Sequence, residues 1–223
     1  SEALTPFNAR INRFRANIKA VCMDMSNAYA KWVGDNLLNA TVVYDHFHVI
    51  QLMNRKLDQI RRKVQGRMEG EAHQRLKGKR WLLLHKADNL TDDKRLEVEE
   101  LRHVSQDLHD AWTMKEYLIK IYQLADDENE ARQLLATWAG VCRRMDIPEL
   151  NTMGRTVERH LDGICAYWKF DRLTNAASEG FNNKIRHLIA QAYGYRDYEY
   201  LKLKVYELPS MVLTKRMLSS CSK

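Results

Sequence analysis

Two short β-rich runs that each end in an aspartate, with one helix between them, limit the fold of this chain more than any other feature. Residues 18–23 form an apolar run that ends at Asp24, and residues 41–44 form a second run that ends at Asp45. The intervening residues 27–38 carry apolar side chains at helical spacing. Strand, helix and strand in this order predict a βαβ unit with two parallel strands and a right-handed crossover.

The carboxyl ends of these two strands are a candidate site. Ligands of open parallel sheets collect at this edge, and neighbouring strands lie about 4.8 Å apart, so Asp24 and Asp45 could serve one cluster. Two structural interpretations stay open, because Asp24 could cap the following helix and Asp45 could be a turn residue. His48 could reach a phosphate or orient a carboxylate, although a lone histidine at such a junction is more often a capping or core residue.

Long amphipathic helices are predicted for the middle of the chain. Apolar residues recur every three or four positions from Val49 to Val64, opposite a basic face. We expect residues 51–170 to form an all-α insertion and residues 209–223 a flexible tail. The same periodicity predicts helices at residues 7–17, 92–124, 128–145, 147–168 and 198–208.

The charge distribution indicates a polyanionic partner. The net charge is +7; residues 51–86 carry 11 Lys and Arg against 3 Asp and Glu, whereas residues 87–130 carry 5 against 13. The two segments could pair with each other, or the basic one could track a nucleic-acid strand. Trp81 could stack on an unpaired base, although a tryptophan before three leucines is more often a core residue. The residues predicted to contact DNA are Arg55, Lys56, Arg61, Arg62, Lys63, Lys79 and Arg80.

Composition excludes several other classes of protein. The cysteines Cys22, Cys142, Cys165 and Cys221 are scattered, which indicates neither a disulfide framework nor a zinc site. No apolar run approaches the roughly 20 residues that span a bilayer, so we expect a soluble protein with no membrane partner. The chain opens at Ser1 in what reads as the middle of a longer sequence.

A polar stripe late in the chain supplies a third acid. A helix from about Ser178 would place Phe181, Ile185 and Leu188 on the side opposite the stripe. Together with two strand-end carboxylates, the leading acid would form a set of hard oxygen donors suited to Mg²⁺ or Mn²⁺, as in two-metal phosphodiester transfer. The residues of the polar stripe are Glu179, Asn182, Asn183 and Arg186.

Six runs, in order, resemble the catalytic domain of bacterial insertion-sequence transposases of the ISL3 family. The resemblance covers about residues 18–208. The runs are Asp24-Met25 with Tyr29, NATVVYDHFHV at 39–49, LDQIRR at 57–62, KRWLLL at 79–84 with Asn89-Leu90, EGFNNKI at 179–185 and AYGYRD at 192–197.

This resemblance implies an α/β, predominantly helical fold: a partial ribonuclease-H-like DDE domain that cuts and rejoins DNA. Residues 1–50 and 171–208 would form its core, and the insertion would separate the second and third catalytic acids. By position, Asp24 resembles the second acid and Glu179 the third, and both would bind metal. Asp45 and His48 resemble an auxiliary acid-x-x-His signature, while a competing assignment makes Asp45 the second acid and a metal ligand. Asn182, Asn183 and Arg186 would orient the ligands or contact the DNA backbone.

The chain departs from the family pattern at its beginning. The first catalytic aspartate should lie on an earlier strand, yet residues 1–23 contain one acid, Glu2. The expected zinc-binding and helix-turn-helix parts are also missing. The resemblance thus implies an N-terminally truncated domain with an incomplete two-metal site, inactive alone. The full-length protein would bind transposon ends as a homo-oligomer in the bacterial cytoplasm. A non-catalytic DNA-binding or regulatory product and a purely structural helical protein are the alternatives.

Overall fold

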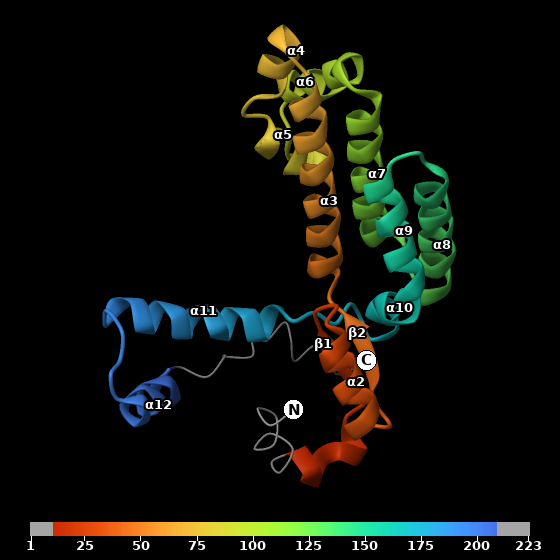
Figure 1. Cartoon of the computed structure of the whole chain (residues 1–223). Helices are drawn as coiled ribbons and strands as arrows, with labels where there is room; N and C mark the ends of the chain where they lie inside the picture. Colours follow the sequence, from red (N-terminus) through yellow and green to blue (C-terminus); the bar gives the residue numbers. More distant parts are fainter. Residues whose placement is uncertain (1–10, 209–223) are drawn as a thin grey trace. The chain divides into compact units, whose positions relative to one another are not determined.

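The computed structural model of the chain describes residues 11–208, which divide into two units between Leu173 and Thr174. The first unit holds a two-stranded sheet and most of the helices, and the second holds two helices (Figure 1). In residues 11–208 no helix is both long and apolar enough to cross a membrane.

The predicted βαβ unit is confirmed. Strands β1 (Ala20–Met23) and β2 (Thr41–Tyr44) pair in parallel, with Met23 opposite Tyr44, and α2 (Asn27–Asn36) connects them. Residues 7–10 of the helix predicted at 7–17 lie outside the described residues, and Asn12–Asn17 form the 3-10 helix η2. The fold is therefore mostly helical with a small parallel sheet.

Helix α3 (His46–Arg67) carries the chain from the sheet into the helical region. It begins where the Asp45 carboxylate accepts a hydrogen bond from the Phe47 N–H, at 2.8 Å, which satisfies one of the free amides of the first turn. The helix runs unbroken across residue 50, where the sequence predicts the insertion to begin. Its buried stripe matches the predicted apolar positions and consists of Val49, Met53, Leu57, Ile60 and Val64.

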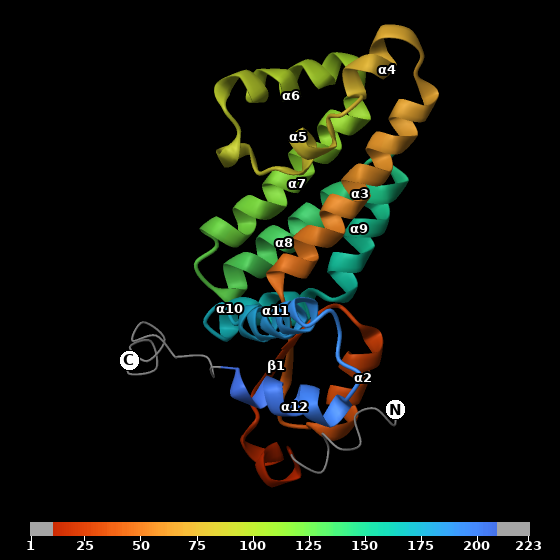
Figure 2. The same ribbon diagram turned by 90° about the vertical axis from the view of Figure 1, so that its left-hand side faces the viewer.

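Four helices run side by side, and one core joins them to the sheet (Figures 1 and 2). Helices α7 (Gln106–Leu124) and α9 (Pro148–Arg159) pack against α3, α8 (Glu128–Arg144) packs against α7 and α9, and α10 (Leu161–Lys169) packs against β2. The main core cluster includes side chains from β2, from α8 and from α10, such as Val43, Trp138 and Ile164. The strands and these helices therefore share one hydrophobic core.

Two long helices predicted from the sequence are each broken in the structure. The predicted helix 92–124 is two helices, α6 (Asp92–Val104) and α7, separated by extended backbone at Ser105, whose hydroxyl accepts from the Leu108 N–H. The predicted helix 147–168 is likewise divided at His160 into α9 and α10. Neither break has a glycine or proline, so apolar periodicity runs through both without a signal.

The far end of the first unit, which we call the tip, consists of α4 (Gly70–Leu76), α5 (Arg80–Leu84), η3 (Ala87–Asn89) and α6. It has a separate small cluster of buried residues, Leu82, Leu90 and Val98. The fully buried Lys115 of α7 ties the tip to the bundle. Its ammonium group donates to the carbonyls of Leu83 (2.8 Å) and His85 (2.5 Å).

The second unit is a pair of helices, α11 (Ala176–Gln191) and α12 (Tyr198–Glu207). The turn between them has positive φ at Tyr193 (52°) and Gly194 (100°), and the Asp197 carboxylate caps α12. The helix predicted from about Ser178 is thus present and begins at Ala176. The tail predicted at 209–223 lies outside the described residues.

The contact between α8 and α9 depends on Gly154. A Cβ atom at this position would lie 2.7 Å from the Ala139 carbonyl oxygen, so Gly154→Ala should force the helices apart and destabilise the protein by about 1–3 kcal/mol. At Gly140 a Cβ would meet only an Arg144 side-chain atom at 3.7 Å, so Gly140→Ala should be neutral or stabilise by roughly 0.5–1 kcal/mol. Urea unfolding of both variants measures the difference; equal effects would contradict this packing.

Candidate functional site

Asp24 and Asp45 both follow the paired strands, at the same edge of the sheet. The backbone N–H of Asp45 donates to the Met23 carbonyl at 3.0 Å, which extends the pairing to the strand ends. Their side chains nevertheless lie in different surroundings. Asp24 is exposed, whereas Asp45 is 2% exposed and caps α3.

Asp45 lies beside a buried aromatic cluster. Its carboxylate is 3.4 Å from His46 Nδ1, and the His46 ring lies 5.1 Å from Tyr167 and 5.7 Å from Tyr122. Burial, with a contribution from the Asp45 charge, holds the pKa of Tyr122 well above its usual value. The sequence left open a structural role for Asp45 as a turn residue before the next helix, and in the structure this residue caps α3.

Asp24 opens onto a groove of about 520 Å³, which we call the strand-end groove. Helix α3 contributes cationic and imidazole side chains to it, and α9 contributes a further wall that sequence reasoning missed. The wall residues Thr152, Thr156 and His160 are spaced by four, the one sequence signal that they share a helical face. The groove is lined by Asp24, Met25, Ser26, Asn27, His48, Gln51, Leu52, Arg55, Lys56, Thr152, Thr156 and His160.

The imidazole of His160 stands at the point where α9 ends. It lies edge-on to the Tyr44 ring at 5.1 Å. Burial, and then the charge of Arg159, lowers the pKa of His160. A neutral imidazole can both donate and accept a hydrogen bond, so His160 adds a polar but uncharged group to the strand-end groove.

A second groove, of about 540 Å³, runs along α3 beside α5, and we call it the α3–α5 groove. Gln51 and Arg55 line both grooves, so the two depressions share a ridge on α3. The lining residues on α3 recur every three or four positions and form one stripe. They are Phe47, Ile50, Gln51, Asn54, Arg55, Asp58, Gln59 and Arg62, with Arg80 and Leu84 from α5.

Asp58 organises the arginines of this groove. Its carboxylate accepts from Arg61 at 2.9 Å, pairs with Arg62 at 2.8 Å and lies 3.6 Å from Arg80 Nε. Burial opposes ionisation, but the three arginines hold the pKa of Asp58 below its usual value. One negative charge is therefore surrounded by three positive ones, and the excess charge is positive.

The seven predicted DNA-contact residues separate into two groups. Arg55, Lys56, Arg62 and Arg80 line the strand-end groove or the α3–α5 groove. The other three are engaged within the protein: Arg61 is 12% exposed and bonds Gln65, while two lysines pair with acids on neighbouring helices. Those pairs are Lys63 with Glu149 of α9 and Lys79 with Glu97 of α6.

Trp81 is on the surface, so its predicted place in the core is wrong. The residue is 63% exposed, and the Arg80 guanidinium lies over its ring at 4.9 Å. The two leucines that follow, Leu82 and Leu83, take the buried positions instead. The five-residue helix α5 has one apolar side, and its first two residues face outward.

Glu179 lies in the first turn of α11. On the same helix, Asn183 accepts a hydrogen bond from Arg186 at 2.8 Å, and Asn182 is exposed. The partnership of Glu179 with Asp24 stays a prediction, since each belongs to a separate unit. Among the described residues, no group of three or more His, Cys, Asp or Glu side chains could hold a metal ion.

The Lys63–Glu149 pair gives a test of its structural role. Burial opposes ionisation of Glu149, but the Lys63 hydrogen bond holds its pKa below the usual value. A lowered pKa stabilises the fold above the unfolded value near 4.3, and this stability is lost as pH falls through the folded pKa. Because Lys63 is 56% exposed, Lys63→Gln should cost only about 0.5–1 kcal/mol at pH 7.

Urea unfolding at pH 7 and at pH 3 measures this cost. We expect the difference between wild type and Lys63→Gln to shrink at the acidic pH, where Glu149 becomes protonated. Lys120→Gln, which replaces an exposed lysine of α7, is the matched control and should change stability at neither pH. A cost for Lys63→Gln that is the same at both pH values would contradict the assignment.

Comparison with known proteins identifies the family. The ISL3-type transposase family matches residues 1–205. The transposase for insertion sequence IS1001 of Bordetella parapertussis is 33% identical over 191 residues, 84% of this chain and 47% of that protein. The transposase for IS1557 of Mycobacterium tuberculosis is 25% identical over 204 residues, 81% of this chain and 45% of that protein.

The chain therefore spans about half the length of the curated relatives it matches. No solved structure matches it. The family match nevertheless covers nearly the whole sequence. The chain belongs to the ISL3 family of insertion-sequence transposases.

Proposed function

We propose that the chain is part of the catalytic domain of an insertion-sequence transposase, in which Asp24 and Glu179 help to cleave and rejoin transposon-end DNA. One observation carries the proposal. The exposed Asp24 carboxylate follows β1 and opens onto the strand-end groove, which α3 lines with Arg55 and Lys56. A carboxylate beside cations is the arrangement that phosphodiester chemistry uses, since the cations neutralise the DNA phosphates.

The geometry favours Asp24 over Asp45 as the second catalytic acid. Asp45 is buried and caps α3, so its carboxylate stabilises the helix that presents the cations. His48, in the first turn of α3, lines the strand-end groove with Asp24 and would contact a phosphate or orient that carboxylate. In this proposal Asp45 stabilises the fold, and His48 contacts the phosphate or the Asp24 carboxylate in the strand-end groove.

The metal proposal rests on the chemistry of the acids. Carboxylates are hard oxygen donors suited to Mg²⁺ or Mn²⁺. Asp24 and Glu179 would each give one ligand, and the acids of residues 11–208 do not complete a site by themselves. Two bound ions would activate the attacking water or hydroxyl and stabilise the leaving oxygen. Asn182, Asn183 and Arg186, on the helix of Glu179, would orient its carboxylate or contact the DNA backbone.

The fold proposal follows from the same elements. We infer a ribonuclease-H-like core in residues 1–50 and 171–208, because parallel strands β1 and β2 end at the acids and α11 carries the third. Residues 51–170 would be its insertion. In the complete transposase we expect transposon ends as the DNA partner, self-association into an oligomer, and action in the bacterial cytoplasm.

A non-catalytic DNA-binding or regulatory role is the second candidate. The basic grooves lie wholly within the described residues, whereas the acids there form no metal-holding group. Salt-dependent DNA binding that survives Glu179→Gln, without any cleavage, would favour this role for the chain. Cleavage that depends on Glu179 would favour the catalytic role.

One prediction from the proposed function concerns catalysis by the 223-residue chain alone. We expect no nicking or strand transfer with Mg²⁺ or Mn²⁺, because residues 1–23 offer one acid, Glu2, where the family places its first aspartate. A supercoiled-plasmid nicking assay measures this. Metal-dependent nicking by wild type that disappears in Glu179→Gln would show that the chain already holds a complete site.

Another prediction from the proposed function concerns which cations bind DNA. Replacing Arg55, Arg62 and Arg80 by Gln should weaken duplex binding and reduce the slope of log affinity against log salt by about 2–3, roughly one unit for each lost phosphate contact. The matched variant replaces Arg61, Lys63 and Lys79, which line neither the strand-end groove nor the α3–α5 groove, and should change the slope much less. Fluorescence anisotropy at several salt concentrations measures the slope for each variant. Equal slopes for the two variants would refute this division of the cations.

A further inference from the structure

We propose that the α3–α5 groove binds a short stretch of unpaired DNA strand, with phosphates on its arginines and bases against its apolar and amide side chains. This rests on the proposed DNA-processing function and names the substrate form that this groove selects. The groove combines side chains for bases with side chains for phosphates, whereas a surface that binds only duplex backbone needs cations alone.

The groove has the shape of a track. Its lining on α3 runs from Phe47 to Arg62, and 15 steps of 1.5 Å make it about 22 Å long. The stripe is continuous because its members recur every three or four residues. A track of this length has room for a few nucleotides, the range of site sizes that single-strand grooves use.

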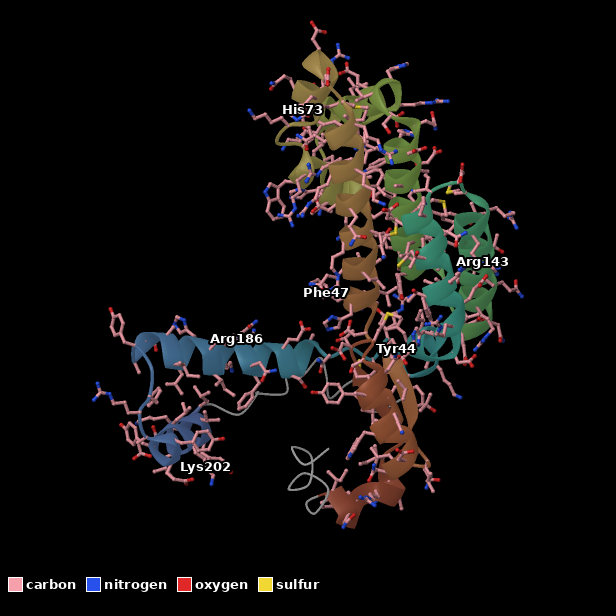
Figure 3. All side chains as sticks on the ribbon, in the orientation of Figure 1. Tyr44, Phe47, His73, Arg143, Arg186 and Lys202 are labelled. Atoms are coloured by element: carbon pink, nitrogen blue, oxygen red, sulfur yellow. The ribbon has the colours of Figure 1, made fainter. Side chains whose placement is uncertain are left out.

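The part of the groove near the start of α3 suits bases. Phe47 is 55% exposed although it lies in the first turn of α3, where Figure 3 shows its position. An exposed phenylalanine in a groove offers a flat face on which any base can stack. Ile50 beside it makes the same part of the groove apolar.

The middle of the groove offers amides. Asn54 lines it with a side-chain amide, a group that has one oxygen acceptor and two N–H donors. The Watson–Crick edge of an unpaired base carries donors and acceptors that such an amide can bond. In a duplex that edge is already used in base pairing. Gln51 and Gln59 line the same stretch.

The part of the groove near Arg62 and Arg80 suits phosphates. Arg62 and Arg80 both lie against the Asp58 carboxylate, and Arg80 also stacks on Trp81, so the two guanidinium groups are held in place before DNA arrives. Each guanidinium has more donors than the carboxylate takes, which leaves N–H groups for phosphate oxygens. Arg55 continues the positive charge toward the strand-end groove, where Asp24 lies.

The test compares three forms of one DNA sequence by fluorescence anisotropy: a single strand, a blunt duplex, and a duplex with a five-nucleotide single-stranded overhang. Wild type should bind the single strand and the overhang more tightly than the blunt duplex. Phe47→Ala and Asn54→Ala should each weaken single-strand and overhang binding by about tenfold, within the range of a lost stacking or base contact, and change duplex binding less than twofold.

Matched variants separate charge from base contact. Arg62→Gln with Arg80→Gln should weaken all three forms, whereas Lys120→Gln with Arg144→Gln, two exposed cations of α7 and α8, should weaken none appreciably. Thermal unfolding checks that each variant is folded; Phe47→Ala should pass, because the ring is more than half exposed.

Three outcomes would overturn the proposal. Wild type could bind the blunt duplex as tightly as the single strand, or Phe47→Ala and Asn54→Ala could affect duplex and single strand equally or not at all. In these cases the groove binds backbone only, and the proposed DNA-processing function stands. If wild type binds none of the three forms even at low salt, both proposals fail.

Discussion

The rotational setting of α3 is the constraint on which the rest of the structure depends. The Asp45 cap fixes the residue at which the helix begins, and the stripe from Val49 to Val64 fixes which side is buried. At 100° per residue, these two conditions leave no freedom for the other positions. They bring Arg55 and Arg62 to the grooves and turn Lys63 toward α9. A single buried carboxylate at a strand end thereby determines where the positive charge of the protein lies.

The same constraint explains why the sequence identifies the basic helix but does not show which of its cations line the grooves. Arg61, Arg62 and Lys63 are adjacent in sequence and alike in charge, yet they meet three different surroundings. Arg61 turns into the protein beside Gln65, Arg62 lines the α3–α5 groove, and Lys63 pairs with Glu149. Arg61 and Arg62 share Asp58 of their own helix, and Lys63 pairs with a helix far along the chain. Which of the three faces a groove depends on how α3 packs against other helices, and the residues beside them in sequence do not show it. The acidic segment 87–130 provides Glu97, which pairs with Lys79 of the basic segment. This pair agrees with the interpretation in which the two segments pair with each other.

The elements with a strong local signal were predictable, and their tertiary relations were not. The strands, the βαβ order and the apolar stripe of α3 follow from residue periodicity alone. The breaks at Ser105 and His160 do not, because their flanking helices have continuous periodicity and the turns use ordinary residues. Trp81 was misplaced for a related reason, since a helix of five residues buries only part of an apolar run. For the candidate site, the sequence predicts the acids Asp24, Asp45 and Glu179, and the structure places Asp24 on the strand-end groove. The wall that α9 adds to this groove requires the fold.

The buried Lys115 has a consequence for how the tip is joined to the bundle. The tip has a separate cluster of three buried apolar residues, and it also places Leu76, Leu83 and Leu101 in the main core. Besides this packing, Lys115 of α7 bonds the carbonyls of Leu83 and His85 at the end of α5. A polar tether therefore adds to apolar packing in holding α5 on the bundle. Because α5 also carries Arg80, the position of an arginine that we propose to contact DNA depends on a side chain that lines neither groove. A change at position 115 would therefore alter the tip while every residue of the proposed DNA-contact surface is kept.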